Sequence, residues 1–126
     1  GRVLLCRRRD TGAWNLPGGA VERGESPWQA VIREVDEETG LQVVVGRLQG
    51  VYAKPDKNEI VFSFECEIAG GRITESDEAD RIEYFPPDDL PGSLLEKQRE
   101  RILDWAAAPS RTRLKEQFSS AERRGG

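Results

Sequence analysis

The segment Gly19–Leu41 constrains the fold of this chain more than any other part of the sequence. Ser26-Pro27-Trp28-Gln29 is typical of a helix start: Ser is a favoured N-cap, Pro suits the first helical position, and Gln can complete a capping box. Gly40 suits the left-handed conformation that ends many helices. These signals predict a helix from about Pro27 to Thr39.

The predicted helix has an apolar face and an acidic face. The apolar side chains that recur at helical spacing predict a buried stripe of Trp28, Val31, Ile32 and Val35. Three carboxylates, Glu34, Glu37 and Glu38, lie on an adjoining face roughly 120° away. Like charges at this spacing destabilise a helix by about 0.2–0.5 kcal/mol per pair. Taken alone they could form an ordinary solvated face, but their convergence also suits a hard-oxygen site for Mg²⁺ or Mn²⁺.

The identities across this segment fall at fixed offsets: Gly19, Glu25, Arg33-Glu34-Val35, Glu37-Glu38 and Gly40-Leu41. The pattern resembles the Nudix box of the Nudix hydrolases, enzymes that cleave diphosphate bonds in nucleoside diphosphates linked to another group. The resemblance implies an α/β fold of the Nudix type, an α/β/α sandwich with a mixed central sheet. No position of the box is substituted, so the implied activity is that of a Nudix pyrophosphohydrolase.

The resemblance also implies a role for each matching residue. The principal ligands of Mg²⁺ or Mn²⁺ would be Glu37, Glu38 and the backbone carbonyl of Gly18. Glu34 would be a further ligand or the general base that activates water. Arg33 and Glu25 would form an ion pair that holds the loop against the helix and orients Glu34.

A second acidic segment, Glu75–Asp80, precedes a predicted strand. By resemblance, Glu78 is the first choice for an additional ligand or base, so the identity of the general base stays open between Glu34 and Glu78. The alternative for this segment is an ordinary solvated loop.

The sequence does not select the substrate. A (d)NTP and an ADP-ribose or nucleotide-sugar substrate are both compatible with the pattern, and a non-catalytic nucleotide-sensing or protein-binding Nudix domain is the alternative from another class. Residues that could contact the nucleoside or phosphates are Trp14, Asn15, Tyr52 and Lys54. Trp14 and Tyr52 could instead be core aromatics.

Composition narrows the function further. The chain has 126 residues, a net charge of −4 and no histidine. The acidic balance argues against a surface for polymeric nucleic acid, and the absence of histidine excludes Ser-His-Asp triads and His-ligated zinc. No apolar run approaches membrane-spanning length and no signal-peptide pattern is present, so we expect a cytoplasmic protein without membrane contact. The expected partner is a small nucleotide.

The remaining patterns predict one Nudix domain over residues 1–108, followed by a polar C-terminal extension, 109–126, that is helical or frayed. Strands are expected at Val3–Arg8, Trp14–Leu16, Ala20–Glu22, Gln42–Tyr52, Glu59–Ile68 and Arg81–Phe85, and a second helix at Ser93–Ala107. The resemblance implies a further strand before Gly1. Its absence would leave a sheet edge open, so a homodimer is a possible arrangement.

Overall fold

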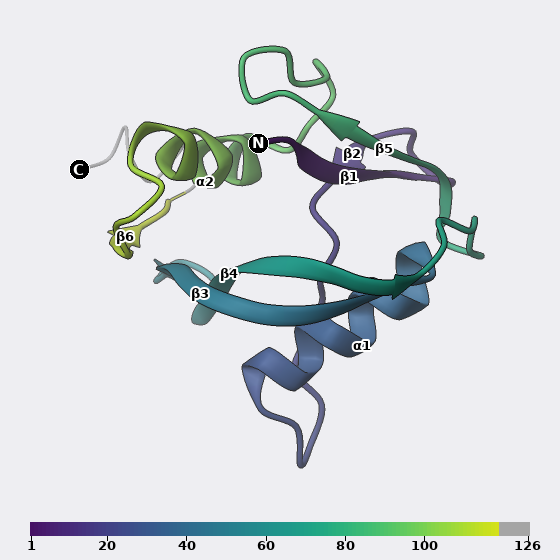
Figure 1. Ribbon diagram of the computed structural model, residues 1–126. Helices are drawn as coiled ribbons and strands as arrows, with labels where there is room; N and C mark the ends of the chain where they lie inside the picture. The colour runs from purple at the N-terminus through teal and green to yellow at the C-terminus, as the bar shows by residue number, and fades with distance from the viewer. Residues whose placement is uncertain (119–126) are drawn as a thin grey trace.

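Two small sheets and two helices build the part of the chain that the computed structural model describes, residues 1–118 (Figure 1). In chain order the elements are β1 (Val3–Arg8), β2 (Trp14–Asn15), α1 (Pro27–Thr39), β3 (Leu41–Lys54), β4 (Glu59–Gly71), β5 (Ala79–Phe85), α2 (Glu96–Ala107) and β6 (Arg113–Glu116).

The two sheets differ in how their strands pair. One has the order β2-β1-β5 and is antiparallel throughout. The other has the order β4-β3-β6 and is mixed, because β3 pairs antiparallel with β4 and parallel with β6. Helix α1 covers one face of the β3–β4 hairpin, and the β1–β5 sheet lies on the other side of that hairpin (Figure 1). The predicted α/β fold with mixed strand pairing is confirmed, with the strands divided over two sheets.

Local capping fixes both ends of α1. The Ser26 hydroxyl accepts from the Gln29 N–H at 3.2 Å, and the Gln29 side chain accepts from the Ser26 N–H at 2.9 Å. This is the predicted capping box. At the other end Gly40 has a φ of 79°, and its N–H donates to the Asp36 carbonyl at 2.9 Å. The helix therefore begins and ends where the sequence predicts.

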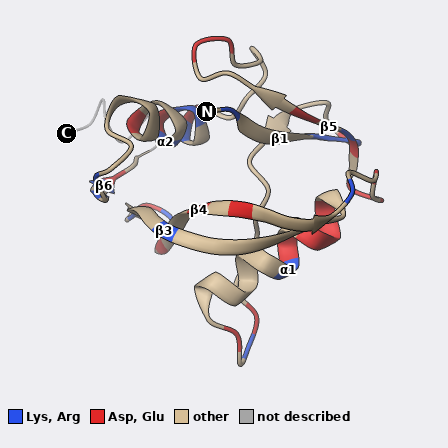
Figure 2. Ribbon diagram, in the orientation of Figure 1, with Lys and Arg blue, Asp and Glu red and all other residues tan. Residues whose placement is uncertain are grey.

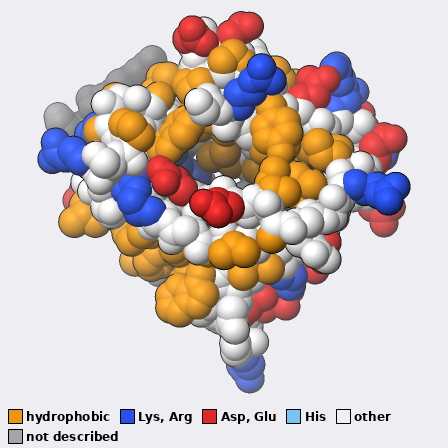
Figure 3. All heavy atoms as spheres, viewed as in Figure 1, with side chains coloured by type: hydrophobic (Ala, Val, Ile, Leu, Met, Phe, Trp, Pro, Cys, Tyr) orange, Lys and Arg blue, Asp and Glu red, His pale blue; other side chains and the backbone are white. Residues whose placement is uncertain are grey.

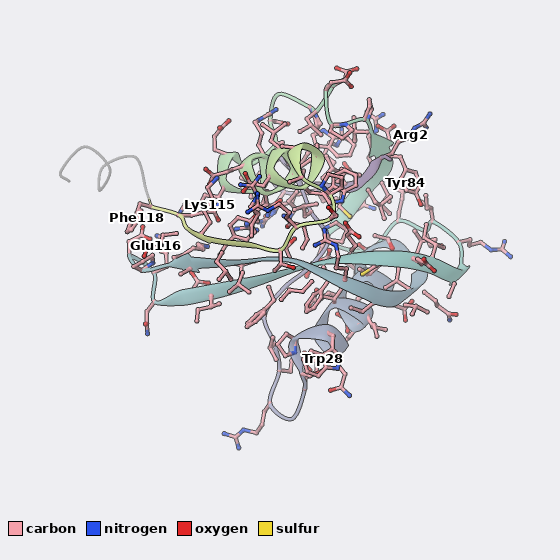
Figure 4. All side chains as sticks on the ribbon, turned by 60° about the vertical axis from the view of Figure 1, so that its left-hand side comes forward. Arg2, Trp28, Tyr84, Lys115, Glu116 and Phe118 are labelled. Atoms are coloured by element: carbon pink, nitrogen blue, oxygen red, sulfur yellow. The ribbon has the colours of Figure 1, made fainter. Side chains whose placement is uncertain are left out.

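The predicted buried stripe of α1 is partly wrong. Trp28 is 54% exposed and Ile32 is 40% exposed, whereas the buried residues are Ala30, Val35 and Thr39. Helical periodicity predicts the angles between side chains around the helix axis. Which side of the helix is buried depends on where the neighbouring strands pack. Here β3 and β5 contact the helix, and Trp28 lies on α1 below the β3–β4 sheet (Figure 4).

Other elements differ from their predictions near loops. Ala20–Glu22 does not form a strand. The strand β5 begins at Ala79, two residues before its predicted start, and α2 begins three residues after its predicted start. Within the predicted polar extension, residues 113–116 form β6 rather than a helix, because they pair with β3. Residues 119–126 of that extension lie outside the described residues.

The core joins the antiparallel sheet to α2. One cluster consists of Leu5, Trp14, Leu94 and Ile102. Between the two sheets lies a cavity of about 950 Å³, whose lining includes Val3, Val35, Phe64 and Ile102, and Figure 3 shows the hollow on this face of the molecule. In the described part of the chain, neither helix is long and apolar enough to cross a membrane.

Candidate active site

A smaller cavity, of about 440 Å³, lies where the C-terminal half of α1 approaches the ends of β1 and β5. Its lining includes Arg8, Arg9, Asn15, Gly18, Glu38 and Glu78. Acidic residues gather on α1 and basic residues mark the end of β1 (Figure 2). The cavity therefore brings together charges of both signs from segments that are far apart in the sequence.

The Arg33 guanidinium is the main cation of the helix side. It donates two hydrogen bonds to Glu25, from Nε to Oε2 at 2.6 Å and from Nη2 to Oε1 at 3.0 Å. It also donates to Glu34 at 2.8 Å, to Glu37 at 3.2 Å and to the Ala20 carbonyl at 3.1 Å. The side chains of Arg33 and Glu25 are 22% and 16% exposed. The predicted pair is thus present and partly buried, and it fastens the loop to the helix.

These contacts stabilise the charged forms of both partners. The hydrogen bonds to Glu25 and Glu34 raise the pKa of Arg33. In return, the Arg33 guanidinium holds the pKa of Glu25 below its usual range. Glu25 therefore keeps its charge to lower pH than a free glutamate, and it anchors Arg33.

Glu38 has a different environment. Its carboxylate accepts from the Gly18 N–H at 3.2 Å. The pKa of Glu38 is raised to about 8, chiefly by burial and also by a hydrogen bond to Glu34 and the negative charges of Glu34 and Glu78, whereas the Gly18 N–H lowers it. Among residues 1–118, Glu38 makes no ion pair.

Gly19 allows the loop to lie directly against Glu34. A Cβ placed on Gly19 would be 2.6 Å from the Oε1 of Glu34, closer than real side chains approach. Glycine at this position therefore lets the Glu34 carboxylate lie against the loop without moving.

The predicted acidic segment reaches the same cavity. Asp77 and Glu78 line it together with Glu38, and the charge of Glu78 acts on Glu38. Glu75 instead contacts Arg9, at 3.3 Å. The structure thus places Glu78, the first choice from the sequence, beside the carboxylates of the helix.

The four predicted substrate contacts separate into different places. Asn15 lines the cavity beside Glu38. Trp14 is 7% exposed and packs edge-on against Phe85 at 5.0 Å, and Tyr52 is fully buried with its hydroxyl donating to Asp104 at 3.0 Å. Both are therefore core aromatics, which was the alternative to substrate contact predicted from the sequence. Lys54 pairs with Glu59 at 3.6 Å and lines the larger cavity.

Arg8 and Arg9 line the cavity but were not among the predicted site residues. The available signal was the run of three arginines that ends the first predicted strand. Such a run has no fixed meaning until the fold shows which of its members faces the site.

Residues 1–106 match the family model described as the NUDIX domain. The chain belongs to the Nudix family. A MutT-like protein of Streptomyces ambofaciens is 39% identical over 104 residues, covering 82% of this chain and 68% of the relative. An ADP-ribose pyrophosphatase of Methanocaldococcus jannaschii is 39% identical over 105 residues, covering 78% of this chain and 62% of the relative. The chain therefore spans about two thirds of the length of these relatives.

The fold of this Nudix domain is also that of solved structures. The crystal structure of an ADP-ribose pyrophosphatase from Streptococcus suis superposes with a TM-score of 0.73 at 27% identity. The superposition covers 92% of this chain and 90% of the other.

The Nudix box of this chain can be tested for its fit to a divalent cation. Glu34 and Glu38 lie beside one another, and their oxygens are the donors that Mg²⁺ and Mn²⁺ prefer. Glu37 is engaged by Arg33 and 59% exposed, and residues 1–118 contain no group of three acidic, cysteine or histidine side chains placed to hold a metal. The pair fits such a cation, and the full ligand set stays a prediction.

Proposed function

We propose that this chain hydrolyses a diphosphate linkage in a nucleoside diphosphate derivative, with Mg²⁺ or Mn²⁺ as cofactor. The observation that supports this most is the pairing of Glu34 and Glu38 beside the Gly18–Gly19 loop. The pKa of Glu38 is raised to about 8 mainly by burial, and the neighbouring Glu34 adds to the shift, so a bound cation would favour the charged form of this side chain. A cation held there would lie beside a cavity whose other wall carries Arg8, a guanidinium paired with Asp10 that a diphosphate could also contact.

The proposed division of work follows from the contacts. Glu34, Glu37, Glu38 and the Gly18 carbonyl would hold the metal. When bound, the metal neutralises phosphate charge and lowers the pKa of its water. Arg33 and Glu25 fix the orientation of Glu34 through the hydrogen bonds described above. Either Glu34 or Glu78 accepts the proton of the attacking water, since both face the region around Glu38.

Two substrate classes are the main candidates. ADP-ribose and nucleotide sugars come first, because a relative at 39% identity and a matched structure are both ADP-ribose pyrophosphatases by name. The second class is a (d)NTP, for which the box is equally suited. Asn15 is the predicted nucleoside or phosphate contact that lies at the cavity.

A substrate panel tests the proposal. The purified chain is incubated with ADP-ribose, nucleotide sugars, dinucleoside polyphosphates and (d)NTPs, with Mg²⁺, with Mn²⁺ or with chelator, and products are separated by ion-exchange chromatography. ADP-ribose should give AMP and ribose phosphate, whereas a (d)NTP should give the monophosphate and pyrophosphate. Metal-dependent binding of a nucleotide without any cleavage would favour the non-catalytic alternative.

Assembly and location remain predictions. A homodimer would scatter light as twice the 14.1 kDa of the chain, and a mass near 14.1 kDa at micromolar concentration would contradict it. The cytoplasmic location is checked by fractionating cells that express the protein.

A further inference from the structure

The strand wall of the cavity contains a β-bulge. In the ladder between β1 and β5, Arg7 lies opposite Arg81 and Arg8 lies opposite Ala79, so Asp80 is an extra residue. Its carboxylate accepts two hydrogen bonds from Arg7, from Nε at 2.8 Å and from Nη2 at 2.9 Å. Bulges bend a strand and redirect the neighbouring side chains. The bidentate contact anchors this bulge two residues after Glu78.

Arg9 fastens the acidic turn that precedes the bulge. Its backbone N–H donates to the Glu78 carbonyl at 2.8 Å. Its side chain donates from Nε to the Ser76 carbonyl at 3.1 Å and from Nη2 to the Glu75 carboxylate at 3.3 Å. One residue at the end of β1 therefore holds three positions of the turn.

The turn is also closed internally. The Ser76 N–H donates to the Ala79 carbonyl at 3.0 Å, and the Ala79 N–H donates to the Ser76 hydroxyl at 3.0 Å. Both ends of the turn are thus defined. Between them Asp77 and Glu78 line the cavity with Glu38, and of the two it is the charge of Glu78 that acts on Glu38.

Stability alone does not account for the side-chain contacts of Arg9. The side chains of Arg9 and Glu75 are 47% and 65% exposed, and ion pairs at such exposure contribute little to folding. What these contacts do supply is a fixed geometry, because charge-assisted hydrogen bonds to a carbonyl and a carboxylate restrict where the turn can lie.

We propose that Arg9 is a positioning residue, which acts through Glu78 by holding the turn 75–78 so that the Glu78 carboxylate faces Glu38 across the cavity. This inference rests on the proposed function for its effect on turnover. Its structural part, the immobilisation of the turn by the Arg9 side chain, is independent of any substrate.

Turnover provides the first test, with Arg9→Ala, Arg9→Lys, Glu78→Gln and the double variant Arg9→Ala/Glu78→Gln. Arg9→Ala should lower kcat about 10- to 100-fold with little change in KM, since small misplacement of a reacting group costs this much. Arg9→Lys should recover part of the loss. In the double variant, Arg9→Ala should add little to the loss caused by Glu78→Gln, because both changes remove one function.

Hydrogen exchange provides a second test that needs no substrate. Arg9→Ala should speed exchange of the Ser76 and Ala79 amides about 10-fold, measured residue by residue by NMR, while amides of α1 keep their rates. Arg72→Ala removes one exposed positive charge outside the turn and is the matched control.

The results distinguish a failure of the positioning role of Arg9 from a failure of the proposed function. A raised KM with unchanged kcat in Arg9→Ala would show that Arg9 contacts substrate directly and would overturn the inference. The inference would also be overturned if the losses in kcat of Arg9→Ala and Glu78→Gln multiplied fully in the double variant. Unchanged exchange rates of the Ser76 and Ala79 amides in Arg9→Ala would overturn it as well. If the wild-type chain cleaves no substrate of the panel, the proposed function fails, and the exchange rates alone decide whether Arg9 positions the turn.

Discussion

The two ends of the acidic face of α1 are neutralised in different ways. At one end Arg33 contacts Glu22, Glu25, Glu34 and Glu37, so four negative charges share one cation. At the other end Glu38 is held by a backbone N–H and lies near Glu34 and Glu78. One helix thus carries a compensated cluster and an uncompensated one, within two turns.

Under the proposed function, the difference indicates where a cation would bind. The cluster around Arg33 is balanced within the protein and acts as a brace, whereas Glu38 would gain most from a bound metal. Acidic residues that look equivalent in the sequence therefore have separate tasks, decided by the reach of a single guanidinium.

The largest effect should come from removing two of the proposed metal ligands, one from each cluster. Glu37→Gln/Glu38→Gln should stay folded and lose activity about 10²- to 10⁴-fold, the range found for a catalytic carboxylate. The measurement is kcat at saturating Mg²⁺, with circular dichroism to confirm the fold. Asp36→Asn, an exposed change on the same helix, is the control. Wild-type turnover in the double variant would disprove the site assignment.

Breaking the compensated cluster should have the next largest effect. Arg33→Ala leaves Glu25, Glu34 and Glu37 without their shared cation, so both thermal stability and turnover should fall, turnover by about 10- to 100-fold. Arg33→Lys keeps the charge but cannot form the bidentate contact with Glu25. Its thermal stability and turnover should lie between those of the wild type and those of Arg33→Ala. Calorimetry and kcat measure the two effects. An unchanged Tm and kcat in Arg33→Ala would contradict the bracing role.

Adding metal should raise the thermal stability of the folded chain through the carboxylates near Glu38. At a concentration of about 100 times Kd, Mg²⁺ or Mn²⁺ should stabilise the folded chain by about 2.7 kcal/mol and raise Tm by about 5–10 °C. Glu38→Gln should reduce the shift, because it removes one of the proposed ligands. Equal shifts in the wild type and this variant would place the metal elsewhere.

The smallest effect concerns the opposite wall of the cavity. The hydrogen bonds from Arg7 hold the pKa of Asp80 below its usual range. Their contribution is therefore present above the ordinary pKa of the carboxyl, about 3.9, and is lost as the pH falls through the lowered value. Tm should decline less steeply below pH 4 in Asp80→Asn than in the wild type.

The control for that experiment is Asp88→Asn, an exposed carboxylate outside the ladder between β1 and β5. Its acid profile should follow the wild type. Parallel profiles for Asp80→Asn and the wild type would mean that the Arg7 contact does not support the bulge.

The sequence predicts α1 and its brace well because their determinants are close together in the chain. Ser26, Gln29 and Gly40 specify the helix ends through local hydrogen bonds, and Glu25 and Arg33 are eight residues apart. The exposed positions of Trp28 and Ile32 could not be predicted in the same way. Which side of a helix is covered depends on strands that are distant in the sequence.

The cavity wall formed by the ends of β1 and β5 shows more clearly what the sequence alone cannot predict. The acidic segment was identified as a candidate, but the contacts of Arg7 and Arg9 span 66 to 73 residues. The bulge at Asp80 depends on strand register, which single residues do not reveal. Trp14 and Tyr52 show the same difficulty, because an aromatic residue in a strand fits a pocket or a core equally well until the packing is known.

The contact between Gly19 and Glu34 also limits how this site can be altered. A side chain at position 19 would occupy the space of the Glu34 carboxylate, so a library that varies the loop alone samples variants in which this carboxylate has to move. Positions 19 and 34 are therefore best varied together in a redesign of the site.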